Sequence, residues 1–581
     1  MFGFFRLPKL AGRFGHLRST LLFVLGSVVG ALGGLVVTGV SNLTQVLHHA
    51  LFGLGAGARL SEQAALGHPL LATVPAVGGM LMGATIVLNR KYRKRQPVDP
   101  IEANALHGGR MSMRESAVIT SQTVISSSFG ASVGLEAGYT QLASAAGSWL
   151  ATRFRLRRNE VRMLVGCGAA GAIAAAFGAP LTGAFYAFEL IVGIYSIGLL
   201  APVVGAALAG NLLAVQLGAV QTHIELGAIA TVGPSDIVAF VALGLIGGSF
   251  AVMLMRFVGL VERALVASRL PIWLRPAIGG LAVGGLGLIT PQVLSSGHGA
   301  LHLQFIQSFG LFALVGLLVL KSMASAISLG AGFRGGLFFA SLFLGALIGK
   351  ISAMGAALIG MQVDVGLAAV VGMAAVATGV VGGPLTLTFL ILETTNDLAI
   401  SGAVMVASAI SGVLVREMFG FSFSTWRLHL RGESIRAPYD IGRIRSLTVG
   451  AIMRRDITTI EKETSLSEFR QRFPLGSTER VVAMDSSGAY EGIVLVAEAY
   501  QPWEGEEPLE TIEPLLRHKD RFLLAGINAS DAAAMFEREG SEELAVVENI
   551  TSRKVIGLLT EAYLLRRYSA ALDQGWKDLT S

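Results

Sequence analysis

The sequence predicts a polytopic α-helical membrane protein with two related halves, followed by an α/β region of soluble composition. The 581-residue chain is 52% hydrophobic and only 14% charged, and its mean hydropathy is +0.63. Such values are typical of membrane proteins. Its apolar segments are short and interrupted by Gly or Pro up to Gly420. Beyond that point the composition becomes polar, with alternating strand and helix patterns.

Charge and cysteine content exclude several classes of protein. Basic residues cluster beside apolar segments, which marks cytoplasmic loops. These clusters lack interleaved aromatic residues, so we expect no nucleic-acid partner. The single cysteine, Cys167, excludes an intramolecular disulfide and any multi-cysteine metal site. We also expect no metal, no required cofactor and no enzymatic activity.

The first 420 residues divide into a short basic start and a series of membrane segments. Residues 1–18 are basic and are expected to be cytoplasmic, and 19–420 form the predicted transmembrane domain. Gly178-Ala-Pro180 splits residues 166–193 into two short helices. The other expected apolar segments are 21–40, 70–88, 142–150, 202–217, 236–258, 277–290, 309–329, 336–360, 366–380, 385–393 and 399–415.

One carboxylate stands out in the membrane half. Glu136 follows a Gly/Ser-rich stretch, expected to be a loop, that begins at Ser126 and leads into an apolar segment. An ionisable residue at membrane depth is costly and is a functional candidate by default. Glycines at a helix start let backbone amides converge on an anion. A carboxylate placed there can occupy an anion site or leave it, so Glu136 is a candidate gate. The alternative is a carboxylate that only satisfies free amides at a helix start.

The membrane half contains an internal repeat. Residues 174–189 and 377–393 share G-x-P-L-T, and Pro180 and Pro384 lie 384 − 180 = 204 residues apart. Each proline precedes a glutamate by nine positions, Glu189 and Glu393 respectively. Repeats with broken helices at matching places indicate a transporter whose site lies at the repeat interface.

The C-terminal region reads as a linker and two related α/β units. Residues 421–446 are polar and basic, and are expected to be the linker. Residues 447–503 predict strand–helix–strand–strand, and 504–575 predict a second copy.

Together these motifs resemble the CLC family of chloride channels and chloride/proton exchangers with a C-terminal pair of CBS domains. Four stretches, in the family's order, carry the resemblance over nearly the whole chain. They are Gly134-Leu-Glu136-Ala-Gly-Tyr-Thr-Gln141, Ala175–Glu189, Gly335-Gly-Leu-Phe338-Phe-Ala340 and Gly383-Pro-Leu-Thr386 to Glu393.

The resemblance implies a CLC-type inverted repeat and a homodimer in the lipid bilayer, with one anion pathway per subunit and Glu136 as the gating glutamate. Backbone amides would coordinate chloride or a similar small anion, which permits binding weak enough for release. The implied anion-binding residues are Gly134, Leu135, Gly335, Gly336, Leu337, Phe338 and Ser424. The short loops suggest a bacterial inner (plasma) membrane, with both termini cytoplasmic.

The chain departs from the family pattern at several places. The family's first anion motif falls at Gln96–Pro100, where no serine is present. Leu190 stands where many exchangers carry an inner proton-accepting carboxylate, and Ser424 is the nearest match to an inner tyrosine. Three loop residues also differ, at Leu135, Ala137 and Ala340.

These departures favour passive conduction slightly over proton-coupled exchange. Exchange by another internal route, with Glu189 on a proton path, stays open, although a paired structural role suits Glu189 and Glu393 better. A CBS-regulated magnesium transporter and a membrane-anchored sensor are the alternatives of other classes. The ribose-contacting Thr-x-x-Asp is incomplete at Leu495–Glu498 and at Thr560–Tyr563, so adenosine nucleotide binding is not favoured.

Overall fold

The computed structural model describes residues 15–55, 57–92, 98–219, 232–233, 236–429, 448–501, 509–564 and 566–567. It divides into two compact units, Met1–Asp440 and Ile441–Ser581. Eight helices of the first unit are long and apolar enough to cross a membrane, within the described ranges. Several shorter apolar helices accompany them, as expected for broken segments.

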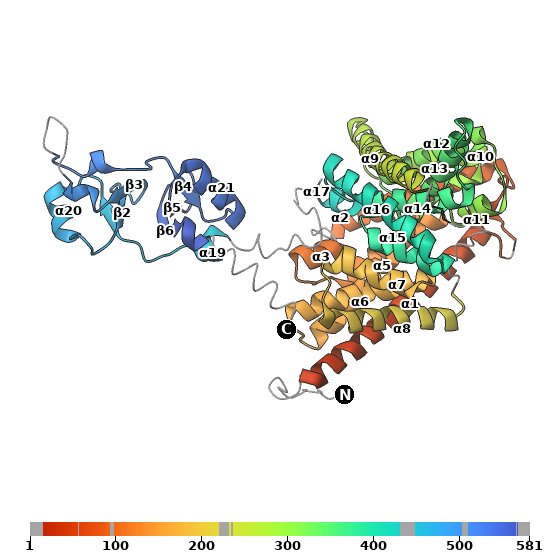
Figure 1. Ribbon diagram of the computed structural model, residues 1–581, viewed down its shortest axis with the longest axis horizontal. Helices are drawn as coiled ribbons and strands as arrows, with labels where there is room; N and C mark the ends of the chain where they lie inside the picture. The colour runs from red at the N-terminus through yellow and green to blue at the C-terminus, as the bar shows by residue number, and fades with distance from the viewer. Residues whose placement is uncertain are drawn as a thin grey trace. The chain divides into compact units, whose positions relative to one another are not determined.

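The first half of the membrane unit contains α1 to α8. Their bounds are α1 (Gly15–Phe52), α2 (Val74–Tyr92), α3 (Pro100–Leu106), α4 (Met113–Ser128), α5 (Glu136–Arg153), α6 (Arg158–Phe177), α7 (Pro180–Tyr186), extended by a π-turn (Ala187–Val192), and α8 (Ile197–Gln216). Figure 1 shows α1 running beside α6 and α8, which pack against it.

The second half repeats this order. Its helices are α9 (Ile237–Ala267), α10 (Arg275–Ile289), α11 (His298–Ile306), α12 (Leu311–Gly330), α13 (Phe338–Leu358), α14 (Val365–Val381), α15 (Pro384–Thr395) and α16 (Leu398–Met418). The contacts repeat as well, because α9 packs on α14 and α16 as α1 packs on α6 and α8.

The two halves are inverted relative to each other. Glu189, after α7, accepts hydrogen bonds at the start of α15, and Glu393, near the end of α15, accepts them at the start of α7. Helices whose ends meet reciprocally in this way run antiparallel. Phe185 and Phe389, also 204 positions apart, stack with ring centroids 4.0 Å apart at the middle of this pair. The predicted inverted repeat is confirmed.

Two local expectations differ from the structure. Ser126–Ser128, expected in a loop, complete α4, because the Ser126 hydroxyl bonds back to the Gln122 carbonyl within the helix (2.9 Å). The expected linker 421–446 opens with helix α17 (Phe423–His429), which packs on α3 and α14 of the membrane unit. The remaining linker residues, 430–446, lie outside the described residues, as do Gln96 and Pro97.

Within its described residues, the C-terminal unit has two three-stranded sheets of identical topology, in orders β1-β2-β3 and β4-β5-β6. In each sheet the first pair is parallel and the second antiparallel, with one register shift. The elements are α19 (Val449–Ile452), β1 (Thr459–Glu461), α20 (Leu466–Arg472), β2 (Arg480–Met484), β3 (Tyr490–Leu495), β4 (Phe522–Leu524), α21 (Ala529–Glu539), β5 (Glu543–Val547) and β6 (Val555–Thr560). The predicted strand–helix–strand–strand order is therefore present twice.

The two copies exchange their leading segments. α19 precedes the first sheet but packs on β4 and β6, and the Val449 amide donates to the Ile527 carbonyl (2.9 Å). The segment before the second sheet does the reverse, since the Ile512 amide donates to Thr464 (3.1 Å) and the Ile512 side chain joins the first core. Each predicted unit therefore contains a segment that completes the other.

Candidate functional site: the junction of two helix starts

The starts of α5 and α13 meet between the two halves. Gly134 and Gly336 exchange both backbone hydrogen bonds, N···O 2.9 and 3.2 Å, just before the two helices begin. The first amides of both helices therefore point toward one place, and such amides carry the partial positive charge of a helix N-terminus. The structure brings together the two Gly-rich stretches singled out in the sequence.

The serines of the first stretch bind the second half. Ser126 accepts a hydrogen bond from the Arg334 amide (3.0 Å). The Ser132 amide donates to the Ser328 hydroxyl (2.9 Å), and the Ser132 hydroxyl pairs with Ser325 (3.0 Å). These contacts span about two hundred residues and hold the two helix starts in register.

Glu136 is the first residue of α5 and is only 4% exposed. The backbone amide of Phe339 faces its carboxylate, while Oε2 has no hydrogen-bond partner in the described structure. A Cβ at Gly134 would lie 1.8 Å from Oε2, so any larger residue there would displace the Glu136 carboxylate. Glu136 thus folds back over the glycine loop and places its negative charge where the two helix starts meet.

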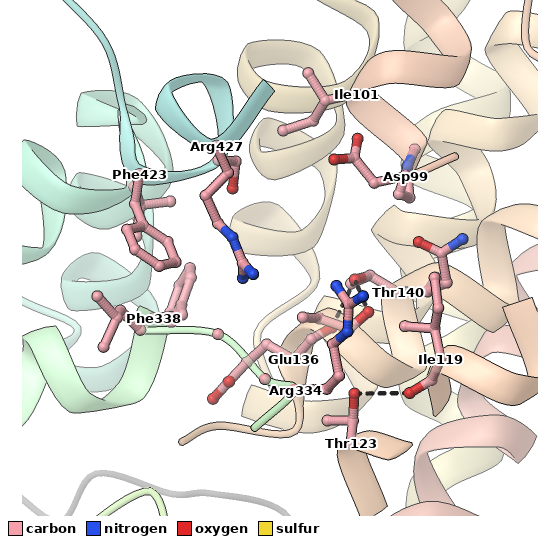
Figure 2. Close-up of a pocket in the computed structure, with 18 of the residues that line it drawn as sticks. Asp99, Ile101, Ile119, Thr123, Glu136, Thr140, Arg334, Phe338, Phe423 and Arg427 are labelled. Carbon is pink, nitrogen blue, oxygen red and sulfur yellow. Dashed lines mark hydrogen bonds between the residues drawn. The ribbon is translucent and has the colours of Figure 1, made fainter. Parts of the chain in front are cut away.

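A cavity of about 170 Å³ opens on one side of the Glu136 side chain. We call it the Arg427 cavity. The predicted residues Gly335, Gly336, Leu337, Phe338 and Ser424 line it. Figure 2 shows Glu136 and Phe338 on one wall, with the Arg334 and Arg427 side chains extending into the same space from different segments.

Several cavity residues were not anticipated from the sequence. Arg334 precedes Gly335, and Arg427 lies in the expected linker, so the two guanidinium groups reach the cavity from segments distant in the chain. Tyr186 and Thr140 also line it and hydrogen-bond to each other through their hydroxyls. A tyrosine is therefore present, although it comes from α7 and not from α17.

The missing serine motif has a structural counterpart. Asp99 caps α3, its carboxylate accepting from the Glu102 amide (2.8 Å), and it lines the Arg427 cavity. A side-chain carboxylate thus occupies the start of α3.

A second cavity, of about 80 Å³, lies on the other side of Glu136. We call it the Arg59 cavity. Leu135, one of the predicted residues, lines this cavity and not the first. Among the described residues, Glu136 alone lines both. Glu136 therefore lies between the two cavities, as a gate would.

The other two candidate carboxylates serve the scaffold. Glu189 accepts from the Leu385 and Thr386 amides and the Thr386 hydroxyl, at 2.9, 2.8 and 2.6 Å. Glu393 accepts from the equivalent groups of Leu181 and Thr182, at 2.7, 2.8 and 2.7 Å. Each glutamate caps the other half's broken helix, which supports the structural interpretation.

Leu190 is buried in an apolar cluster with Ile101, Val165 and Ile191. No carboxylate follows Glu189 here, and the side chain that replaces it cannot carry a proton. The substitutions at Ala137 and Ala340 are placed differently. Ala137 lines the Arg427 cavity, and Ala340 is fully buried in α13.

Comparison with known sequences agrees with this geometry. The family model described as voltage gated chloride channel matches residues 78–416. A ClcB-like chloride channel protein of Ralstonia nicotianae is 31% identical over 342 residues, covering 58% of this chain and 80% of that protein. The voltage-gated ClC-type chloride channel ClcB of Escherichia coli K12 is 26% identical over 404 residues, covering 68% and 96%.

Solved structures share the fold. A slow cyanobacterial Cl⁻/H⁺ antiporter matches with a TM-score of 0.61 at 20% identity, covering 71% of this chain and 97% of that one. A CLC-type fluoride/proton antiporter matches at 0.57 and 22% identity, covering 69% and 97%. A eukaryotic CLC transporter matches at 0.57 and 16% identity, covering 94% and 98%. Since the family model spans more than half of the residues, this chain belongs to the voltage-gated chloride channel (CLC) family.

Proposed function

We propose that this protein conducts chloride or a similar small anion passively across a bilayer, with Glu136 as the gate. One observation carries the proposal. The Glu136 carboxylate partitions two cavities at the point where the starts of α5 and α13 meet, and its Oε2 has no partner among the described residues. When the carboxylate is protonated or swings away, the amides it faces become available to an anion.

The coordination of the anion follows from the same geometry. Amides near Gly335, Gly336 and Phe338 supply dipoles, while Arg334 and Arg427 raise the local potential in the Arg427 cavity. Dipoles bind an anion less tightly than a fixed contact ion pair, which allows release. Ser424 lines the cavity beside Phe423, so its hydroxyl is a further candidate ligand.

The test uses purified protein in liposomes. A chloride gradient is imposed without a proton gradient, and chloride flux and internal pH are recorded together for wild type and Glu136→Gln. Passive conduction predicts chloride flux with no internal pH change, and a mutant whose flux no longer varies with external pH. Protons driven uphill by chloride would reject passive conduction, and no flux with chloride, nitrate or fluoride would reject the anion pathway.

Proton-coupled exchange is the second candidate, favoured by one specific contact. The Tyr186 phenol donates to the Thr140 hydroxyl oxygen, and the Thr140 hydroxyl donates in turn to the Glu136 carbonyl (2.5 Å). Asp99 lines the same cavity, so hydroxyls and a carboxylate stand near Glu136 although Leu190 is apolar. If wild type does move protons, Tyr186→Phe should lower proton flux at least tenfold and leave chloride flux within twofold. Equal loss of both would assign Tyr186 to the anion pathway instead.

We further propose an orientation of the membrane unit in the bilayer and an oligomeric state. Arg18, near the start of α1, pairs with Glu160 at the start of α6 (2.6 Å). The basic residues that accompany these two helix starts, around Arg18 and in Arg153–Arg162, therefore lie on one side of the membrane unit. The positive-inside rule makes that side cytoplasmic, in a plasma membrane. We also propose a homodimer, as the family resemblance implies. Light scattering from the detergent-solubilised protein would test it, and a monomeric mass would reject it.

A further inference from the structure

The Arg59 cavity differs in chemistry from the site at the helix starts. It is enclosed by α1, the segment around Arg59, the end of α4, the start of α5 and the turn before α11. Its polar lining is Ser41, Thr44, Gln45, His48, Arg59, Ser61, Ser127, Glu136, Tyr139, Ser295, Ser296 and His298. About 80 Å³ gives room for a small ion with water.

Two backbone amides beside this cavity are already hydrogen-bonded within the protein. α11 begins at His298, but the amides of Gly299 and Ala300 already donate to the Ser61 hydroxyl, at 3.0 and 3.3 Å. His298 is the first residue of this helix. The polar side chains that line the cavity are therefore further candidate ligands for an ion.

Arg59 supplies an uncompensated cation. Its side chain lines the cavity and makes no hydrogen bond or ion pair with another described residue. The neighbouring carboxylate of Glu62 lies instead against His302, at 3.6 Å. A guanidinium group presents five donors that suit an anion. A partly enclosed guanidinium with no protein acceptor points to a ligand that supplies one.

Lys321 adds a second positive charge behind the wall of the cavity. The residue is fully buried, and its ammonium donates to the carbonyls of Val293 (3.1 Å) and Ser295 (2.8 Å). No described carboxylate pairs with it. Ser295, whose carbonyl accepts from this ammonium, also lines the cavity. A buried charge is costly unless an opposite charge offsets it, and Coulomb attraction is strong where water is scarce.

His298 connects the cavity to the gate. Its Nδ1 contacts the Ser296 hydroxyl, and its ring stacks on Phe339 with centroids 3.7 Å apart. The Phe339 amide faces the Glu136 carboxylate. Only Phe339 therefore separates a group bound beside His298 from the Glu136 carboxylate.

We propose that the Arg59 cavity is a second anion-binding site, which holds a small inorganic monovalent anion against the Arg59 guanidinium, with Lys321 stabilising its charge from behind. The assignment of this anion as the transported one rests on the proposed function, but its binding does not. An ion here would wait on the far side of Glu136 from the Arg427 cavity and would be the next to enter when Glu136 moves.

The experiment is a bromide soak of crystals of the full chain, with anomalous diffraction locating the ion, and titration calorimetry of bromide in detergent. Wild type is expected to show an anomalous peak within hydrogen-bond distance of Arg59. Arg59→Gln should lose that peak and weaken binding about tenfold. Arg153→Gln removes the same charge at an exposed position at the far end of α5 and should keep both.

Two further variants guard against a folding defect. Arg59→Lys keeps the charge and should retain the peak, while Lys321→Met removes the buried charge and should weaken binding several-fold. Bromide confined to the Arg427 cavity in wild type, or a peak that persists in Arg59→Gln, would overturn the second site. Liposome flux separates the two proposals, because a conducting protein without bromide at Arg59 refutes only this site. A protein that binds bromide there but moves no anion refutes only the transport.

Discussion

The two halves of the membrane unit carry their carboxylates differently. Glu189 and Glu393 occupy equivalent positions and make the same three hydrogen bonds to the opposite half. Glu136 has no equivalent, because Phe338 is the first residue of α13 where Glu136 is the first of α5. The carboxylates that repeat hold the scaffold together, and the one that does not repeat is the one we propose as the gate.

This difference shows how a scaffold of two similar halves can contain a site whose two sides differ. Duplication supplies two converging helix starts, and the field of both dipoles falls on one point. One glutamate and one phenylalanine then distinguish the two starts. Three kinds of variant test this interpretation: one removes a repeated carboxylate, one adds a carboxylate to the second helix start, and one removes a hydroxyl from each symmetric contact.

The largest effect is expected from Glu393→Ala. It leaves two amides and one hydroxyl at the start of α7 without their acceptor, at a cost of about 1–3 kcal/mol each. Thermal unfolding in detergent should show a drop of several degrees or loss of folded protein, and Glu189→Ala should behave alike. Glu417→Ala, at an exposed position in α16, serves as the control. Unchanged stability in either variant would contradict a scaffold role for the pair.

A second variant makes the halves alike at the site. Phe338→Glu places a carboxylate at the start of α13, opposite Glu136, where it competes for the same amides and repels anions. Chloride flux in liposomes should fall at least tenfold. Phe338→Leu keeps the position apolar and should retain flux within about threefold. Undiminished flux in the glutamate variant would place the anion pathway elsewhere.

The smallest effect tests the symmetry itself. Thr182→Val and Thr386→Val each remove one hydroxyl donor from a glutamate that keeps its two amide donors. Each should lower the free energy of unfolding by about 1–2 kcal/mol, because a bond to a charged acceptor is lost. The two melting temperatures should fall by similar amounts. A marked inequality would show that the two caps are not equivalent.

The sequence predicted the scaffold and the gate candidate for identifiable reasons. G-x-P-L-T with a glutamate nine positions after the proline is a pattern that chance seldom repeats at one spacing. Glu136 was conspicuous because a carboxylate among apolar residues is costly. The repeated motif and the isolated carboxylate each lie within a short stretch of sequence, so both can be recognised from the sequence alone.

The rest depends on contacts between distant segments. Arg59, Arg334 and Arg427 are ordinary basic residues in loops or helix ends, and only the fold brings them to either side of Glu136. Ser126 looked like a loop residue because serine favours non-helical conformations, yet its hydroxyl bonds back into α4 and to the Arg334 amide. The exchange of segments in the C-terminal unit could not be predicted from the sequence either, since the pattern of a short segment does not say which sheet it packs on.

That exchange has a mechanical consequence. The chain leaves the membrane unit and enters the C-terminal unit through α19, which is anchored in the second sheet and not in the one that follows it in sequence. A force applied to the chain at α19 would therefore act on β4 and β6 before it reached the first sheet. A truncation after the first copy would remove the second sheet and with it the contacts that hold α19. We therefore expect the two copies to fold and unfold as a single unit.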